Sequence, residues 1–206
     1  MSINNFGDLK AKISSTLFHS RFASEYADYT TMFEAAANRR LRVRQMEAML
    51  PLTTVGGEVA LPADYLVWRT IRPNAATHWP WDELEYVHPA YLPTTATTLG
   101  RKPRLFCIEG NTLRIRPIDD ANPYEFHYYQ KIPTIAGSDI DSNWLLTTYP
   151  DLYVAGVMTE LFVKQRNMEG AQLEKARRDE LFVEIIQLSA LTTGATSPSV
   201  RTAEYF

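Results

Sequence analysis

Histidines are the residues in this chain best suited to hold a metal ion or carry a proton, but their spacing forms no motif. The chain has four, namely His19, His78, His88 and His127. Metal ligands in a sequence are usually separated by only a few residues, and no two of these histidines lie that close. The sequence therefore predicts ordinary surface or half-buried histidines, no metal and no other cofactor.

Carboxylates lie beside aromatic residues in the segment WPWDELEY, residues 79–86. Its acidic residues are Asp82, Glu83 and Glu85. Paired carboxylates beside stacking aromatics are typical of carbohydrate-cleaving sites. The alternative is a solvated acidic turn anchored by its aromatics, since paired carboxylates are common and no second feature indicates a sugar cleft. The sequence favours this alternative, predicts no catalytic residue, and leaves a small carbohydrate-active protein as the least favoured hypothesis.

Nucleophile and phosphate-loop motifs are missing from the sequence. Cys107 is the single cysteine and stands in the apolar run LFCI, which predicts a buried thiol acting as a small hydrophobic side chain. A single cysteine excludes an internal disulfide and a multi-cysteine zinc site. There is no GxSxG, and among nine glycines only Gly56 and Gly57 are adjacent, so neither a serine nucleophile elbow nor a phosphate-binding loop is predicted.

The segment RRLRVR, residues 39–44, is the strongest local charge feature. On a helix its arginines would spread around the axis instead of forming one stripe. They would contact nucleic-acid phosphates or form ion pairs within or between subunits, because a guanidinium suits carboxylates well. The net charge of −3 favours ion pairs, and a DNA-binding module using this helix is the alternative. The predicted subunit-interface residues are Arg39, Arg40, Arg42 and Arg44.

The elements that must position these residues begin with two predicted helices. Apolar residues at helical spacing predict the first helix near residues 6–17. The sequence TMFE fits a capping box with Thr31 as N-cap and Glu34 reaching back to it. A second helix is therefore expected over residues 32–49, ended by Pro51.

The middle of the chain, residues 51–135, has the period of strands. Gly56 and Gly57 predict a tight hairpin turn, and residues 65–71 are rich in strand-forming types. The segment RLFCIEGNTLRIR, residues 104–116, predicts a second hairpin. Residues 124–132 predict a strand with alternate aromatics on one face, namely Tyr124, Phe126 and Tyr128. A long loop over residues 73–103 is expected to contain a helical turn near residues 81–86.

The segment SNWLLTTYPDLYVAGVMTEL, residues 142–161, predicts two helix starts. Ser142 is expected to cap a short helical turn, and Pro150 suits the first position of the next helix. From residue 152 to 163 almost every position is apolar, which predicts a helix buried on all sides. A final amphipathic helix is expected over residues 169–191. The predicted core anchors are Trp144, Tyr149, Pro150 and Tyr153.

These elements predict an α+β fold in which a β-subdomain interrupts a helical bundle. The bundle is expected from residues 1–50 and 142–191, the inserted antiparallel β-subdomain from residues 51–141, and an extended tail from residues 192–206. The first residues lack the apolar run of a signal peptide, and no stretch is long enough to cross a bilayer. The sequence therefore predicts no membrane association.

Five segments, in order, are similar to those of the adaptor proteins of tailed bacteriophages. They are TTMFEAAANRRLRVRQME, LPADYLVWRTI, IEGNTLRIRP, YEFHYYQKIPTI and NWLLTTYPDLYVAGVMTEL. The last, with Trp144 and the run from Tyr149 to Tyr153, is the most specific. The resemblance is loose over residues 73–103 and stops after Leu191.

The resemblance implies a non-enzymatic protein of the virion neck, assembled in the host cytoplasm. It would form a ring of about twelve copies beneath the portal protein, contact tail or nozzle proteins, and let double-stranded DNA pass through without specific binding. A polar tail that ends in large aromatics is expected to dock on a partner through anchor residues. The expected portal-docking residues are Pro198, Val200, Tyr205 and Phe206.

Overall fold

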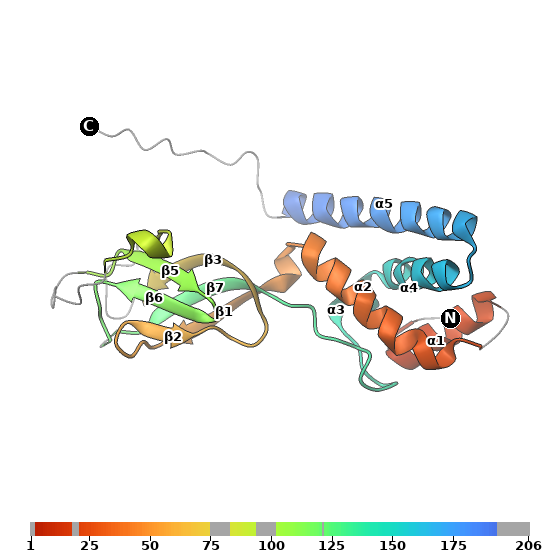
Figure 1. Ribbon diagram of the computed structural model, residues 1–206, viewed down its shortest axis with the longest axis horizontal. Coiled ribbons are helices and arrows are strands. Elements are labelled where there is room, and N and C mark those ends of the chain that lie inside the picture. The colour runs from red at the N-terminus through yellow and green to blue at the C-terminus, as the bar shows by residue number, and fades with distance from the viewer. Residues whose placement is uncertain (1–2, 18–20, 75–82, 94–101, 121, 193–206) are drawn as a thin grey trace. The chain divides into compact units, whose positions relative to one another are not determined.

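The computed structural model describes residues 3–17, 21–74, 83–93, 102–120 and 122–192. It confirms the α+β class, with helices and antiparallel sheets (Figure 1). The chain divides into two compact units. One, the helical unit, is formed by the described residues of Met1–Gln45 and Ile132–Phe206, and the other, the β unit, by those of Met46–Lys131. The sequence had predicted an insertion over residues 51–141.

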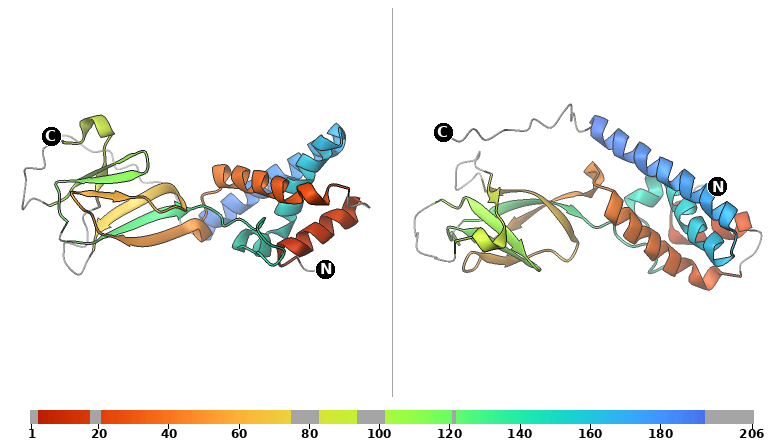
Figure 2. Two further views of the ribbon diagram at one scale, coloured as in Figure 1. Left: turned by 60° about the horizontal axis from the view of Figure 1, so that its bottom comes forward. Right: turned by 45° about the horizontal axis from the view of Figure 1, so that its top comes forward.

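The helical unit is organised around a central, largely apolar helix. Its helices are α1 (Phe6–Leu17), α2 (Tyr26–Arg40), α3 (Trp144–Thr148), α4 (Pro150–Lys164) and α5 (Met168–Thr192), with a 3-10 turn, η1 (Ala23–Glu25), before α2. Helices α1, α2, α3 and α5 all contact α4, and α5 runs alongside it (Figures 1 and 2). The predicted start of α4 is confirmed, because Pro150 lies in its first turn.

Helix α4 is buried on most sides, as the sequence predicts. Its buried residues are Leu152, Tyr153, Ala155, Gly156, Val157, Met158, Thr159 and Leu161. Gly156 lies against the ring of Phe33 on α2, since a Cβ at this position would come within 2.7 Å of the Cγ atom of Phe33. The glycine therefore permits the close approach of α2 and α4.

The predicted bounds of the second helix are wrong. Helix α2 begins at Tyr26, so Thr31 lies inside it and donates its hydroxyl to the Ala27 carbonyl oxygen at 3.0 Å. After Arg40 buried and more exposed residues alternate, with Leu41 and Val43 buried. This alternation is the period of an extended chain, so the helix ends at Arg40. A 3-10 turn, η2 (Arg44–Met46), leads into strand β1 (Glu47–Leu52).

The short helix α3 is capped by Asn143 and not by Ser142, which corrects a second prediction. The Asn143 side-chain oxygen accepts a hydrogen bond from the Leu146 N–H at 2.8 Å. Ser142 instead donates its hydroxyl to the carbonyl oxygen of Asn4 at 2.6 Å. Both residue types can cap a helix, so the sequence alone did not decide between neighbours.

The β unit contains two sheets. The first has the order β1-β7-β3, with β3 (Tyr65–Pro73) and β7 (Tyr124–Gln130), and is antiparallel throughout. The second has the order β2-β6-β5-β4, with β2 (Glu58–Ala60), β4 (Glu85–Tyr86), β5 (Leu105–Glu109) and β6 (Thr112–Arg116). Strand β4 pairs parallel to β5. Pro51, expected to end a helix, lies in the edge strand β1, where its missing N–H is tolerated.

One hydrophobic core serves both sheets. It includes Leu52, Ile71, Tyr124, Phe126 and Tyr128 from the first sheet and Phe106, Leu113 and Ile115 from the second. The predicted aromatic face of β7 is thus confirmed. Both predicted hairpin turns are confirmed as well, with positive φ at Gly56, Gly57 and Gly110.

The predicted loop over residues 73–103 lies partly outside the described residues. Its described part contains no helical turn at residues 83–86, because Glu85 and Tyr86 form β4. The short 3-10 turn η3 (Pro89–Tyr91) follows instead. Backbone pairing decides this segment, since the Glu85 N–H donates to the Arg104 carbonyl at 2.7 Å and the Val87 N–H to the Phe106 carbonyl at 2.9 Å.

Candidate functional sites

A buried polar network joins three elements of the helical unit. Glu34, on α2, is 4% exposed. Its carboxylate atom Oε1 accepts hydrogen bonds from the Tyr153 hydroxyl at 3.1 Å and from the Ile135 N–H at 3.0 Å. The Asn143 side-chain NH2 group donates to the Tyr153 hydroxyl at 2.7 Å. Every member is therefore satisfied, which a buried polar group requires.

The same network holds the chain segment 132–135 where it enters the helical unit. Asn38, one helical turn after Glu34, accepts the Ile132 N–H at 2.9 Å through its side-chain oxygen. The Asn143 NH2 group donates to the Pro133 carbonyl oxygen at 2.7 Å. Side chains thus replace the backbone partners that this extended segment lacks. No motif in the sequence indicated this network, although Glu34 and Asn38 stand at the i, i+4 spacing of one helix face.

The pKa values of Glu34 and Tyr153 are both raised. Burial raises the pKa of the Glu34 carboxyl above its usual value, and hydrogen bonds from Thr134, Ile135 and Tyr153 oppose that rise. Burial also raises the pKa of the Tyr153 hydroxyl, and the nearby Glu34 adds to the effect. Such shifts also occur at catalytic sites. Here the network holds the chain segment 132–135, so its role is structural.

Two of the four predicted interface arginines have partners within the helical unit. Arg40 forms an ion pair with Asp179 on α5 and lies over the ring of Phe182, 5.2 Å from its centroid. Arg42 donates to the carbonyl oxygens of Asn38 and Leu41. It thereby satisfies carbonyls left open by the end of α2. These two side chains stabilise the junction that follows α2.

The other two arginines are exposed. Arg39 lies in the last turn of α2 and Arg44 begins the 3-10 turn η2. The backbone N–H of Arg44 donates to the Ser189 hydroxyl at 3.2 Å, which attaches this part of the chain to α5. Because α2 ends at Arg40 and not at residue 49, the arginines do not share one helix, and a single basic stripe along residues 39–44 does not form.

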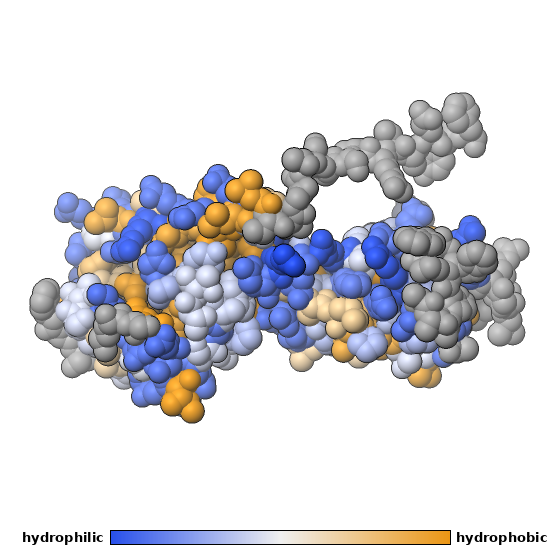
Figure 3. Space-filling model, turned by 180° about the vertical axis from the view of Figure 1, so that it is seen from behind, coloured by the Kyte–Doolittle hydropathy of each residue, from blue (hydrophilic) through white to orange (hydrophobic). Residues whose placement is uncertain are grey.

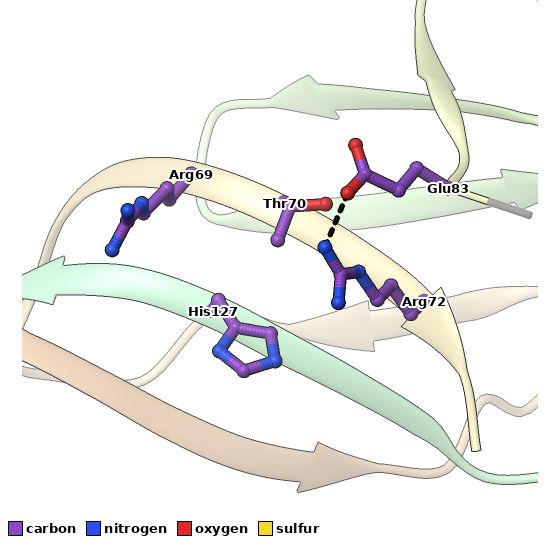
Figure 4. A pocket seen from close by; sticks show the side chains of 5 residues that line it. All are labelled: Arg69, Thr70, Arg72, Glu83 and His127. Carbon is purple, nitrogen blue, oxygen red and sulfur yellow. Dashed lines mark hydrogen bonds and ion pairs between the residues drawn. The ribbon is translucent and has the colours of Figure 1, made fainter. Parts of the chain in front are cut away.

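A polar pocket lies on the β unit (Figure 4), and no sequence motif indicated it. It has a volume of about 410 Å³ and is lined by Arg69, Thr70, Arg72, Glu83 and His127. The first three belong to β3, and a register irregularity between Trp68 and Thr70 brings neighbouring residues of that strand to the pocket. A β-bulge re-aims side chains in this way, which the alternating pattern of the sequence does not reveal.

The charges around this pocket are paired. Arg69 forms an ion pair with Glu47 and Arg72 with Glu83, and the His127 imidazole lies 3.9 Å from the Glu125 carboxylate. Each of these three basic side chains therefore lies beside a carboxylate, so the pocket lacks the excess of positive charge that an anion-binding site uses. The Thr70 hydroxyl is buried and, within the described residues, has no hydrogen-bond partner. The pocket can accept a small polar group there.

The hypothesis of an acidic sugar site gains no support from this geometry. Glu83 is engaged by Arg72, and Glu85 is an exposed residue of β4. Asp82 lies outside the described residues, as do the neighbouring Trp79 and Trp81. Among the described residues, no three metal-ligating side chains come together in a way that could hold a metal ion. Cys107 is buried as predicted, and burial raises the pKa of its thiol.

Exposed hydrophobic side chains are frequent on the helical unit (Figure 3). Those on its helices are Met32, Val163, Met168, Leu173, Val183, Ile186, Leu188 and Leu191. Single exposed apolar residues are normal on any protein. Six of the eight lie on α5, which begins at Met168. On α5 they lie on two sides of the helix, Val183 and Ile186 on one and Leu173, Leu188 and Leu191 on the other.

The predicted core anchors differ in burial. Tyr153 is fully buried, whereas Trp144, Tyr149 and Pro150 are partly exposed. The predicted docking residues Pro198, Val200, Tyr205 and Phe206 lie outside the described residues. In the part of the chain that the structure describes, no helix combines the length and apolarity needed to cross a membrane.

The comparison with protein families gives one match over most of the chain. The model of the family described as SU10 adaptor protein matches residues 4–202. The match includes both compact units, and also residues 73–103 where the resemblance had been loose. No curated protein matches the chain.

Proposed function

The chain belongs to the SU10 adaptor protein family, a family of phage structural adaptors, and we propose that it joins the head of a tailed phage to its tail. It forms a ring of about twelve copies beneath the portal protein and continues the DNA channel. The family match over residues 4–202 carries this proposal, because it covers the whole architecture and not one shared motif.

The proposed protein is a non-enzymatic part of the virion neck, assembled in the host cytoplasm. Its partners are the portal protein, tail or nozzle proteins and further copies of itself. Double-stranded DNA passes through the ring without specific binding. The net charge of −3 and the ion pairs of Arg40, Arg69 and Arg72 support this view, because unpaired basic residues facing the channel would attract phosphates and retain the DNA.

The proposed attachment to the portal is the tail, residues 192–206. Its anchors are Pro198, Val200, Tyr205 and Phe206, which would fill pockets between portal subunits. Ordering a polar segment costs roughly 1–2 kcal/mol per residue of backbone, so aromatic anchors must be joined by further contacts along the tail. The exposed Arg39 and Arg44 are proposed to lie at contacts between adaptor subunits.

A DNA-binding module is the second candidate, and the exposure of Arg39 and Arg44 is the observation that favours it. A titration of duplex DNA against salt separates the two functions. A DNA-binding module would bind with micromolar affinity and a steep loss of affinity as salt rises. The adaptor should show only weak binding, and the double variant Arg39→Ala, Arg44→Ala should leave that weak binding unchanged.

Portal attachment tests the adaptor function directly. The full chain is mixed with the portal protein of the same phage, and the mass of the complex is measured by sedimentation velocity. A complex of defined stoichiometry supports the proposal, whereas separate sedimentation of the two proteins across salt and pH conditions contradicts it. A portal from an unrelated phage is the control for nonspecific association.

A further inference from the structure

Helix α5 has a second apolar seam that its own unit does not cover. Ala171, Phe182 and Ile185 are the residues that α5 buries. Beside them lies a row that is exposed except for the half-buried Asp179, with the alternating four-and-three spacing by which helices pack on one another. The row, here called the α5 seam, consists of Gln172, Ala176, Asp179, Val183, Ile186 and Ala190. Its apolar part is well exposed, since Val183 is 53% and Ile186 43% accessible.

Helix α2 has a shorter exposed row with the same spacing. This row, the α2 seam, consists of Asp28, Met32, Ala35 and Arg39, all of them exposed. Met32 is 53% accessible, while Phe33 and Ala37 on the same helix are buried in the unit. The α2 seam thus has Met32 and Ala35 between two charged ends, whereas the α5 seam has four apolar or small residues with the charge of Asp179 among them.

The two seams do not cover each other within one chain. Inside the helical unit, α2 meets α5 through the stacked rings of Phe33 and Phe182, 6.3 Å apart, and through Arg40, which already forms an ion pair with the seam residue Asp179. The seam residues Met32, Val183 and Ile186 remain exposed despite that contact. Within the described residues of the helical unit, the apolar residues of both seams are therefore uncovered, and another molecule can pack on them.

We propose that the α5 seam of one copy packs against the α2 seam of a second copy of this chain. Their spacing is the same, and their charges select an antiparallel arrangement. When Met32 and Ala35 lie opposite Ile186 and Val183, an antiparallel α2 brings Arg39 to the level of Asp179 and the exposed Glu180. A parallel arrangement would place Asp28 beside Asp179, and like charges repel.

This contact joins two different surfaces, so it is heterologous. Each copy presents its α5 seam to one neighbour and its α2 seam to the other, and such contacts close into a ring when the rotation allows it. The inference deepens the proposed function and rests on it for the ring. The contact between two copies can be tested separately from binding to the portal.

Cross-linking between single-cysteine copies tests the contact. The only native cysteine is buried, so introduced surface cysteines react selectively. Copies carrying Ala35→Cys are mixed with copies carrying Val183→Cys and treated with a short bismaleimide, both with and without the portal protein. The α2–α5 contact predicts a heterodimeric product. Leu173→Cys replaces Val183→Cys as the control, since Leu173 is 71% exposed on the same helix but lies outside the seam.

Charge reversal provides the second, independent readout. Arg39→Glu should reduce the cross-linked yield severalfold, and adding Glu180→Arg on the opposite copy should restore it. Ile186→Asp should abolish the product, whereas Leu173→Asp should leave it unchanged. Equal yields from the Val183→Cys and Leu173→Cys copies, or no product under both conditions, would overturn the proposed contact. If the full chain still binds the portal in that case, the adaptor function stands without this contact. If the copies cross-link but do not bind the portal, the contact stands and the adaptor function is contradicted.

Discussion

The hydroxyl of Tyr153 on α4 donates to the buried carboxylate of Glu34 on α2, 3.1 Å away, although 119 residues separate them in the chain. The same Glu34 oxygen accepts the Ile135 N–H. Two helices and the segment that follows the β unit in sequence therefore meet at one carboxylate. The helical unit depends on this contact for its polar core, and the first predictions concern it.

Replacing Tyr153 by phenylalanine should destabilise the helical unit by roughly 1–3 kcal/mol, because the Glu34 carboxylate and the Asn143 amide each lose a partner inside the core. Urea denaturation followed by circular dichroism measures the change. Tyr29→Phe is the matched control, since the Tyr29 hydroxyl donates to Glu25 in a more exposed tyrosine–glutamate pair. Equal effects of the two variants would show that the buried network contributes no more than a surface hydrogen bond.

Glu34→Gln should change the pH dependence of stability. Burial raises the pKa of Glu34 in the folded protein above its ordinary value of 4.5, so folding favours the protonated form. The wild-type protein therefore loses stability as pH rises from the unfolded-state pKa through the folded-state pKa. The glutamine variant lacks this loss, and the free energy of unfolding of wild type relative to the variant should fall over that range. A constant difference from pH 4 to pH 7 would contradict the shift.

Gly156→Ala should destabilise the contact between α2 and α4 by about 1–3 kcal/mol, since overpacking a dense core forces neighbours to move. The new Cβ would overlap the Phe33 ring, which also packs edge-on against Tyr153 at 4.8 Å. Gly170→Ala on α5 is the control. Its Cβ would meet the side chain of Asn167, which accepts the Gly170 N–H, and the Phe162 ring at 3.2 Å. Both contacts are looser than the overlap at Gly156, and alanine favours a helix by roughly 1 kcal/mol over glycine, so the loss of thermal stability should be smaller than for Gly156→Ala.

Leu145→Ala should destabilise the protein more than Trp144→Ala does. Leu145 is fully buried, and removing a buried leucine side chain costs about 2–5 kcal/mol. Trp144 is partly exposed, so its truncation should cost less than the roughly 3–5 kcal/mol expected for a buried tryptophan. Thermal melts of both variants give the order, and a larger effect at Trp144 would assign that residue a packing role that its exposure does not indicate.

Deleting residues 193–206 should leave the fold intact and weaken attachment to the portal. The described helices and strands end at Thr192, so the thermal melt should not change. Loss of the anchors Tyr205 and Phe206 should reduce the number of copies that sediment with the portal. A milder variant, Tyr205→Ala with Phe206→Ala, distinguishes anchoring by the aromatics from a general need for the tail. Normal occupancy after the deletion would place the docking surface on the folded units.

Strongly periodic segments were predictable from the sequence, and segments ruled by distant contacts were not. The apolar run after Pro150 and the glycine turns at Gly56 and Gly110 gave the correct helix and hairpins, because each signal is local. The capping box at Thr31 was wrong, because α2 already begins at Tyr26 and Thr31 lies inside it. A cap motif inside a helix has no orphan N–H to satisfy.

The candidate sites also combine features that local sequence signals predict with features that depend on distant contacts. The arginines of residues 39–44 were found from composition, but the partners of Arg40 and Arg42 depend on where α2 ends. The polar pocket depends on a register irregularity in β3, and the network of Glu34 depends on residues far apart in sequence. No spacing rule joins such residues. Only the fold brings them together.

Electron microscopy of the full chain mixed with its portal protein tests the central claim most directly. The adaptor account predicts an additional ring on one end of the portal, coaxial with its channel, with adjacent copies in contact and an open centre wide enough for duplex DNA. It also predicts that the ring forms without DNA. Portals that remain bare under conditions in which both proteins are folded, or a protein that coats added DNA instead of the portal, would contradict the account.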